Sequence, residues 1–95
     1  MAYYCYILRC GDQQYYVGAT GDLRQRLVEH GAGRVASTRQ RRPVTLVYYE
    51  VFATAAAAYR RERALKNGRT RKASRERLIQ TFPRARLSSF EGVFS

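Results

Sequence analysis

Apolar and aromatic residues gather in three runs that lack helical spacing. Residues 3–10 and 14–20 are rich in tyrosine and aliphatic side chains, which is typical of strands. The turn signal Gly-Asp-Gln at residues 11–13 separates them and predicts an antiparallel hairpin. Residues 44–52 are dominated by β-branched and aromatic side chains and predict a third strand.

Three other segments predict helices, at residues 22–30, 55–66 and about 71–80. The first begins at a capping box, in which Asp22 is followed three residues later by Gln25. Its Leu23, Leu27 and Val28 are expected to pack on the sheet. The second helix follows Thr54, a residue type that favours helix starts.

These elements predict an α+β fold in the order β-β-α-β-α-α, with a three-stranded antiparallel β-sheet flanked by helices. One domain is expected over residues 1–83. The tail, residues 84–95, is expected to be partly ordered on that domain through Leu87, Phe90 and Phe94.

The charge points to a polyanion. Lys and Arg number 18 against 7 Asp and Glu, a formal net charge of +11, and nearly all the cations are arginines. Such a charge opposes folding by self-repulsion, and arginine binds phosphate through two parallel hydrogen bonds. A basic surface that serves solubility alone is the other interpretation, but the charge favours a nucleic-acid partner.

Cysteine, histidine and hydropathy exclude several other classes. Cys5 and Cys10 fall on opposite faces of one predicted strand, so no disulfide is expected between them. A single histidine leaves no Cys/His set for structural zinc. No stretch approaches the roughly 20 apolar residues that span a bilayer, so we expect no membrane association and an intracellular location.

The hairpin carries two tyrosines and a glycine of interest. Tyr6 and Tyr16 lie on opposite arms of the turn and are expected to be near neighbours. Taken alone, such tyrosines are most often half-buried packing residues. Gly18, inside a strand, marks a place where another group approaches the backbone closely.

The helices carry the other candidates. Arg26 and His30 are four residues apart and share a helix face, where they could bind a phosphate and transfer a proton or simply form a solvated flank. Glu62 lies on the apolar stripe of the second helix, with Arg60, Arg61 and Arg63 on its outer faces. An inward carboxylate needs a salt bridge or a metal ion.

In this order, the residues resemble the GIY-YIG nuclease superfamily. Tyr4-Cys5-Tyr6 stands at the first half-motif and Tyr16-Val17-Gly18 at the second, and the match extends from about residue 3 to residue 79. Arg26 and His30 stand at the family's helix positions, and Glu62 stands at its metal-binding position. The first half-motif has Tyr4 where the family has glycine, as in many small stand-alone members.

The resemblance implies a metal-dependent endonuclease that acts on DNA, in repair or recombination. Glu62 would hold one Mg²⁺ or Mn²⁺, Arg26 would neutralise the phosphate, and Tyr6, Tyr16 or His30 would take the proton of the attacking water. The products would carry 3′-hydroxyl and 5′-phosphate ends. Contacts to the nucleic acid would come from Gly18, Arg34, Arg39, Arg41, Arg42 and Arg71.

Two rival interpretations compete with the nuclease. A non-catalytic nucleic-acid-binding protein with this fold would explain the charge but not the ordered set of site residues. A structural RNA-binding protein of the ribosomal kind would have a long basic arm, which the sequence lacks. We expect a monomer or weak homodimer, cytoplasmic and associated with the nucleoid.

Overall fold

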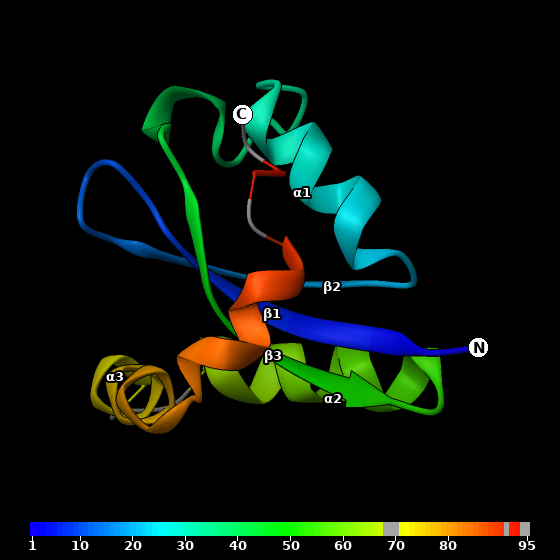
Figure 1. Cartoon of the computed structure of the whole chain (residues 1–95). Helices are drawn as coiled ribbons and strands as arrows, with labels where there is room; N and C mark the ends of the chain where they lie inside the picture. The colour runs from blue at the N-terminus through cyan, green and yellow to red at the C-terminus, as the bar shows by residue number, and fades with distance from the viewer. Residues whose placement is uncertain (68–70, 91, 94–95) are drawn as a thin grey trace.

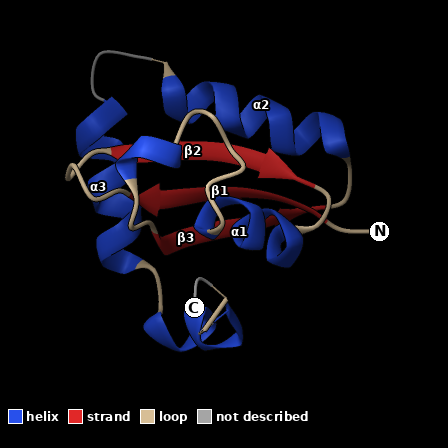
Figure 2. Cartoon of the chain, turned by 90° about the horizontal axis from the view of Figure 1, so that it is seen from above, coloured by secondary structure: helices blue, strands red, loops and turns tan. Residues whose placement is uncertain are grey.

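The computed structural model describes residues 1–67, 71–90 and 92–93 (Figure 1). Its main elements are β1 (Tyr3–Arg9), β2 (Tyr15–Thr20), α1 (Leu23–Gly31), β3 (Thr45–Phe52), α2 (Ala55–Lys66) and α3 (Arg71–Thr81). The strands form one antiparallel sheet in the spatial order β2-β1-β3. Helix α1 covers one face, and α2 and α3 cover the other (Figure 1 and Figure 2).

The α+β fold and the order β-β-α-β-α-α predicted from the sequence are confirmed. Two short 3₁₀ helices were not predicted: η1 (Arg39–Arg41), in the basic loop that joins α1 to β3 (residues 32–44), and η2 (Arg84–Phe90), in the tail. Short 3₁₀ segments are common as connectors and at helix ends, where the hydrophobic pattern gives little signal for them. No helix among the described residues is long and apolar enough to cross a membrane.

The central strand β1 builds an apolar cluster on each face of the sheet. Tyr6, Leu8 and Cys10 pack on one face with leucines of α1. Cys5 and Ile7 pack on the other face with residues of α2 and the chain after α3. Both thiols are buried and unpaired, as the alternation of side chains along a strand predicts.

Helix α1 begins as its capping residues predict. Asp22 accepts a hydrogen bond from the Gln25 amide at 3.1 Å. The prediction that Val28 packs on the sheet is wrong, since 41% of its surface is exposed. Leu23, Leu27 and His30 form the buried face instead, because spacings of four and seven residues return to the same side of a helix.

The tail packs on the α1 side of the sheet. Leu87 and Phe90 contact the cluster there, and the Tyr49 hydroxyl donates a hydrogen bond to the Arg86 carbonyl at 3.1 Å. The guanidinium of Arg24, on α1, donates to the Ser89 carbonyl. The contact expected from Phe94 lies outside the described residues.

The glycine in β2 has a structural reason. Gly18 stands directly opposite Tyr6 in the ladder, and the Tyr6 ring lies over it. A Cβ atom at Gly18 would come within 2.6 Å of both Cζ and the hydroxyl oxygen of Tyr6. The close approach that a strand glycine predicts is therefore made here by a side chain of the protein itself.

Replacing this glycine tests how tightly Tyr6 is held. We expect Gly18→Ala to lower the free energy of unfolding by about 1–3 kcal/mol, because the buried ring has no room to move. Gly21→Ala is the matched control, since its Cβ would meet only Tyr3 ring carbons at 3.4 and 3.5 Å. Chemical denaturation measures both, and equal effects would contradict the packing described for Tyr6.

Candidate active site

A buried chain of hydrogen bonds joins β1, α1 and the basic loop. The Tyr6 hydroxyl lies 2.8 Å from Nε2 of His30, and Nδ1 of His30 lies 2.7 Å from Oγ1 of Thr38. All three residues are fully buried. A neutral imidazole has one donor and one acceptor nitrogen, so one hydroxyl donates to the ring and the ring donates to the other.

Burial sets the protonation of this chain. It lowers the pKa of His30 from 6.5 to about 4, with a further contribution from the positive charge of Arg26. Burial also raises the pKa of the Tyr6 hydroxyl well above its ordinary value, and the neighbouring Tyr16 adds to that rise. Both groups are therefore neutral near pH 7.

Arg26 lies beside the chain and is partly exposed. Its Nη1 forms an ion pair with Oε1 of Glu29 at 3.0 Å. Its positive charge acts against the rise that burial causes in the pKa of Tyr6, so the guanidinium lies near the Tyr6 hydroxyl. Arg26 can therefore offer donors both to the tyrosine and to a ligand at the surface.

Tyr16 connects the buried chain with α2. Its ring centroid lies 6.3 Å from that of Tyr6 and 5.1 Å from that of His30. Nζ of Lys66 lies 5.8 Å from the centroid of the Tyr16 ring and 3.0 Å from Oε2 of Glu62. Tyr16 is partly exposed, unlike Tyr6, so its hydroxyl is the more accessible of the two.

Glu62 is the carboxylate of this group. Its side chain is 21% exposed and pairs with Lys66, one helical turn further on. Because Lys66 also lies against the Tyr16 ring of β2, the carboxylate lies near this edge of the sheet. The prediction that Arg61 lies on the outer face of α2 is wrong, because it pairs with Glu50 of β3 at 2.7 Å.

The structure thus brings together all five predicted catalytic residues, directly or through Lys66. They come from four elements: β1, β2, α1 and α2. Sequence reasoning missed Thr38 and Lys66. The four-residue spacing of Glu62 and Lys66 could have revealed the second, whereas nothing in the basic loop singles out Thr38.

The basic residues predicted to bind nucleic acid differ in their surroundings. Arg34 and Arg39 are exposed. Arg41 pairs with Asp12 at 2.9 Å, and Arg42 donates to the carbonyls of Arg39 and Gly31. The side chain of Arg71 lies outside the described residues.

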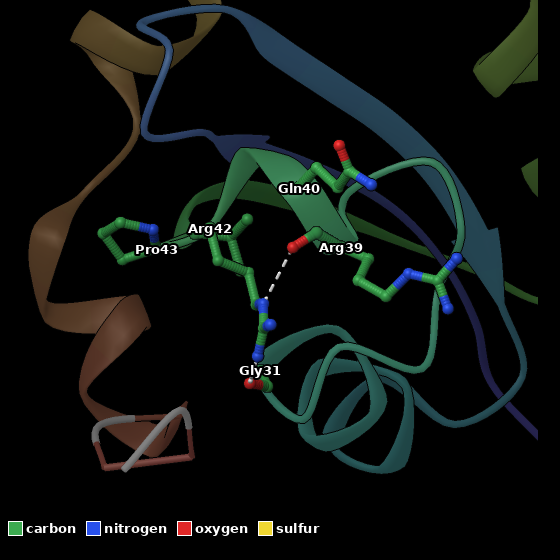
Figure 3. A pocket seen from close by; sticks show the side chains of 6 residues that line it. Gly31, Arg39, Gln40, Arg42 and Pro43 are labelled. Atoms are coloured by element: carbon green, nitrogen blue, oxygen red, sulfur yellow. Dashed lines mark hydrogen bonds between the residues drawn. The ribbon is translucent and has the colours of Figure 1, made fainter.

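A pocket of about 450 Å³ opens beside this loop, at the end of α1 (Figure 3). Arg42 points across it to Gly31, while the Arg39 side chain extends in another direction (Figure 3). Because Arg42 donates to protein carbonyls here, this pocket is built around a structural contact. The catalytic candidates lie elsewhere, around Tyr6 and Glu62.

Comparison with known families agrees with the geometry. The sequence pattern of the GIY-YIG catalytic domain matches residues 2–77. The chain belongs to this family. UPF0213 proteins of Streptococcus pyogenes serotypes M5 and M2 are 48% identical to it over 69 residues, which is 72% of this chain and 75% of theirs.

A solved structure is also similar to this chain. The solution structure of a UPF0213 protein from Bacillus halodurans is 30% identical, with a TM-score of 0.55. The match covers 96% of this chain and 98% of that one. The similarity therefore includes the tail, whereas the family pattern ends at residue 77.

The single histidine allows a direct test of the buried chain. We expect the imidazole of His30 to titrate near pH 4 rather than 6.5 in the folded protein. Between these values the unfolded chain binds a proton that the folded chain does not, so stability falls as pH drops from about 6.5 to about 4.

Nuclear magnetic resonance of the ring measures this titration, and thermal unfolding measures the stability. Arg26→Gln serves as a companion variant, in which the pKa of His30 rises because a positive charge is removed. A midpoint near 6.5 in the unaltered protein would show that the ring is solvated.

Proposed function

We propose that the protein is a divalent-metal-dependent endonuclease that hydrolyses phosphodiester bonds in DNA, leaving 3′-hydroxyl and 5′-phosphate ends. The observation that carries this proposal is the convergence of a guanidinium, two phenols, an imidazole and one carboxylate around one edge of the sheet. They belong to Arg26, Tyr6, Tyr16, His30 and Glu62. GIY-YIG proteins are generally nucleases, which agrees with this chemistry.

The donor set fits one Mg²⁺ or Mn²⁺ ion shared with the substrate. Among the described residues, no three His, Cys, Asp or Glu side chains lie together as a complete metal site. Mg²⁺ usually takes one or two carboxylates and completes its shell with water and phosphate oxygens. Glu62 supplies that carboxylate, and the bound ion would polarise the phosphate and stabilise the leaving oxygen.

Arg26 is suited to the phosphate itself. Its guanidinium is partly exposed and lies beside Tyr6. A phosphate oxygen that gains charge during the reaction would draw this group from Glu29, because an arginine–phosphate pair can form two hydrogen bonds. Arg26 therefore acts as a donor to the reacting group.

The two tyrosines take different roles. The hydroxyl of Tyr6 is buried, bonded to His30 and held protonated by its raised pKa. Tyr6 therefore acts as a neutral group that positions Arg26 and His30. Tyr16, which is partly exposed and lies near Lys66, is the hydroxyl that an attacking water can reach.

Substrate binding follows from the exposed arginines. Arg34 and Arg39 project from the loop that Thr38 and His30 fix to the active site. Such cations bind phosphates with little sequence preference and a strong dependence on salt. DNA as substrate, a cytoplasmic location on the nucleoid and a role in repair or recombination are parts of the same proposal.

One observation favours the alternative, a non-catalytic nucleic-acid-binding protein. The carboxylate of Glu62 is already paired with Lys66 at 3.0 Å. A lysine that held it permanently would exclude a metal ion. Lys66 is 48% exposed, however, so its ammonium can move into solvent or to a phosphate.

A cleavage assay with matched variants tests the proposal. Labelled single-stranded, duplex and branched DNA and RNA are incubated with Mg²⁺, Mn²⁺ or EDTA. We expect metal-dependent cutting that Glu62→Gln reduces at least about 1,000-fold, because the reaction loses its metal ligand. Affinity for DNA stays equal or rises, since a negative charge is removed.

Glu76→Gln on α3 makes the same chemical change away from the site and is expected to cut normally. Cutting that survives in Glu62→Gln would overturn the metal assignment. Binding without cutting on every substrate would favour the non-catalytic alternative.

The division of roles between the tyrosines has its own test. We expect Tyr16→Phe to lower the cleavage rate about 100-fold or more with little loss of stability, because it removes an accessible proton acceptor. Tyr6→Phe leaves a buried nitrogen of His30 without its partner and lowers the free energy of unfolding by about 1–3 kcal/mol. Cleavage rates and denaturation curves are measured for both variants. A larger loss of cleavage in Tyr6→Phe, with the larger loss of stability in Tyr16→Phe, would reverse the assignment.

A further inference from the structure

One aromatic ring of the described chain is left largely in solvent. Tyr59, on α2, is 54% exposed, whereas the other described tyrosines and phenylalanines are buried or partly buried. It makes no ring or cation contact with the described residues. Its exposure is therefore not explained by packing within the described part of the fold.

The surroundings of Tyr59 are those of the active site. A hollow of about 320 Å³ is lined by Tyr59 together with Glu62, Arg63, Lys66 and Asn67. Tyr59 and Glu62 are three residues apart on one helix, which places their Cβ atoms about 5–6 Å apart. The exposed ring is therefore an immediate neighbour of the carboxylate assigned to the metal ion.

The combination of an open ring with nearby cations has a specific use. Proteins that bind single-stranded nucleic acid place aromatic rings under the bases and cations along the backbone. Arg63 and Lys66 supply the cations beside Tyr59. A ring that served only an apolar ligand would not need two positive charges in the same hollow.

We propose that Tyr59 is a stacking platform for an unpaired base next to the scissile phosphate, so the preferred substrate is single-stranded or locally unpaired nucleic acid. This inference rests on the proposed nuclease function and names its substrate class. Inside a duplex, both faces of each base are covered by its neighbours, so a ring can stack there only on a base that has left the helix. Stacking is tolerant of sequence, because every base has such a face.

The absence of tryptophan from the chain allows a direct test. Tyr59→Trp places a single fluorescent indole in the hollow. In EDTA, so that no cutting occurs, we expect an oligothymidylate single strand to quench this fluorescence and a blunt duplex to quench it much less. Equal quenching by the two, or none by the single strand, would overturn the inference.

Affinity measurements provide a second test. We expect Tyr59→Ala to weaken single-strand binding about ten-fold, with duplex binding nearly unchanged. Tyr59→Phe keeps the ring and is expected to bind as the unaltered protein does; a loss equal to that of Tyr59→Ala would assign the effect to the hydroxyl and overturn the inference. Val51→Ala is the matched control, because Val51 is 51% exposed on β3, away from the hollow.

The two proposals can fail separately. Selective quenching without cutting on any substrate would leave the stacking platform standing and reject the nuclease. Metal-dependent cutting that Glu62→Gln abolishes, with Tyr59→Ala unaffected in single-strand binding and cutting, would reject the platform alone.

Discussion

The buried hydrogen-bond chain from Tyr6 through His30 to Thr38 joins three separate segments of the fold. An imidazole with no access to water must have both nitrogens hydrogen-bonded, because a buried polar group without a partner destabilises the fold. Meeting that requirement fixes the central strand, the first helix and the basic loop to one another. It also requires Gly18 opposite the ring, so the sequence of the second strand is restricted by the same chain.

This constraint divides the site into a rigid interior and an accessible edge. Tyr6 and His30 are neutral and enclosed, so they can position other groups but are shielded from solvent. Tyr16, Lys66 and Glu62 lie around the edge strand and are at least partly exposed to solvent. Under the proposed function, the interior supplies geometry, and the edge supplies the groups that would contact phosphate, metal and base.

The sequence predicts the elements well because each has its own period and capping residues. Asp22 and Thr54 accept hydrogen bonds at the starts of the two helices they were expected to cap. Pairings between elements are harder. Leu23, Leu27 and His30 have the spacing of one helix face, which is the buried one, but Val28 beside them is also apolar. Only tertiary contacts decide between them, and the same holds for the pairing of His30 with Thr38.

The pairing of charged side chains is equally hard to predict from the sequence, and it has a consequence for ligand binding. Among the described residues, four acidic side chains form ion pairs: Asp12, Glu29, Glu50 and Glu62. Under the proposed function, a phosphate that approaches the edge competes for Arg26 and Lys66. Each cation it draws away leaves a carboxylate unpaired, and at Glu62 that carboxylate becomes available to a divalent ion. Nucleic acid and metal would then strengthen each other's binding, because linkage between two ligands is reciprocal. Lys66, which pairs with this carboxylate in the absence of substrate, would thus couple the binding of metal to the binding of substrate.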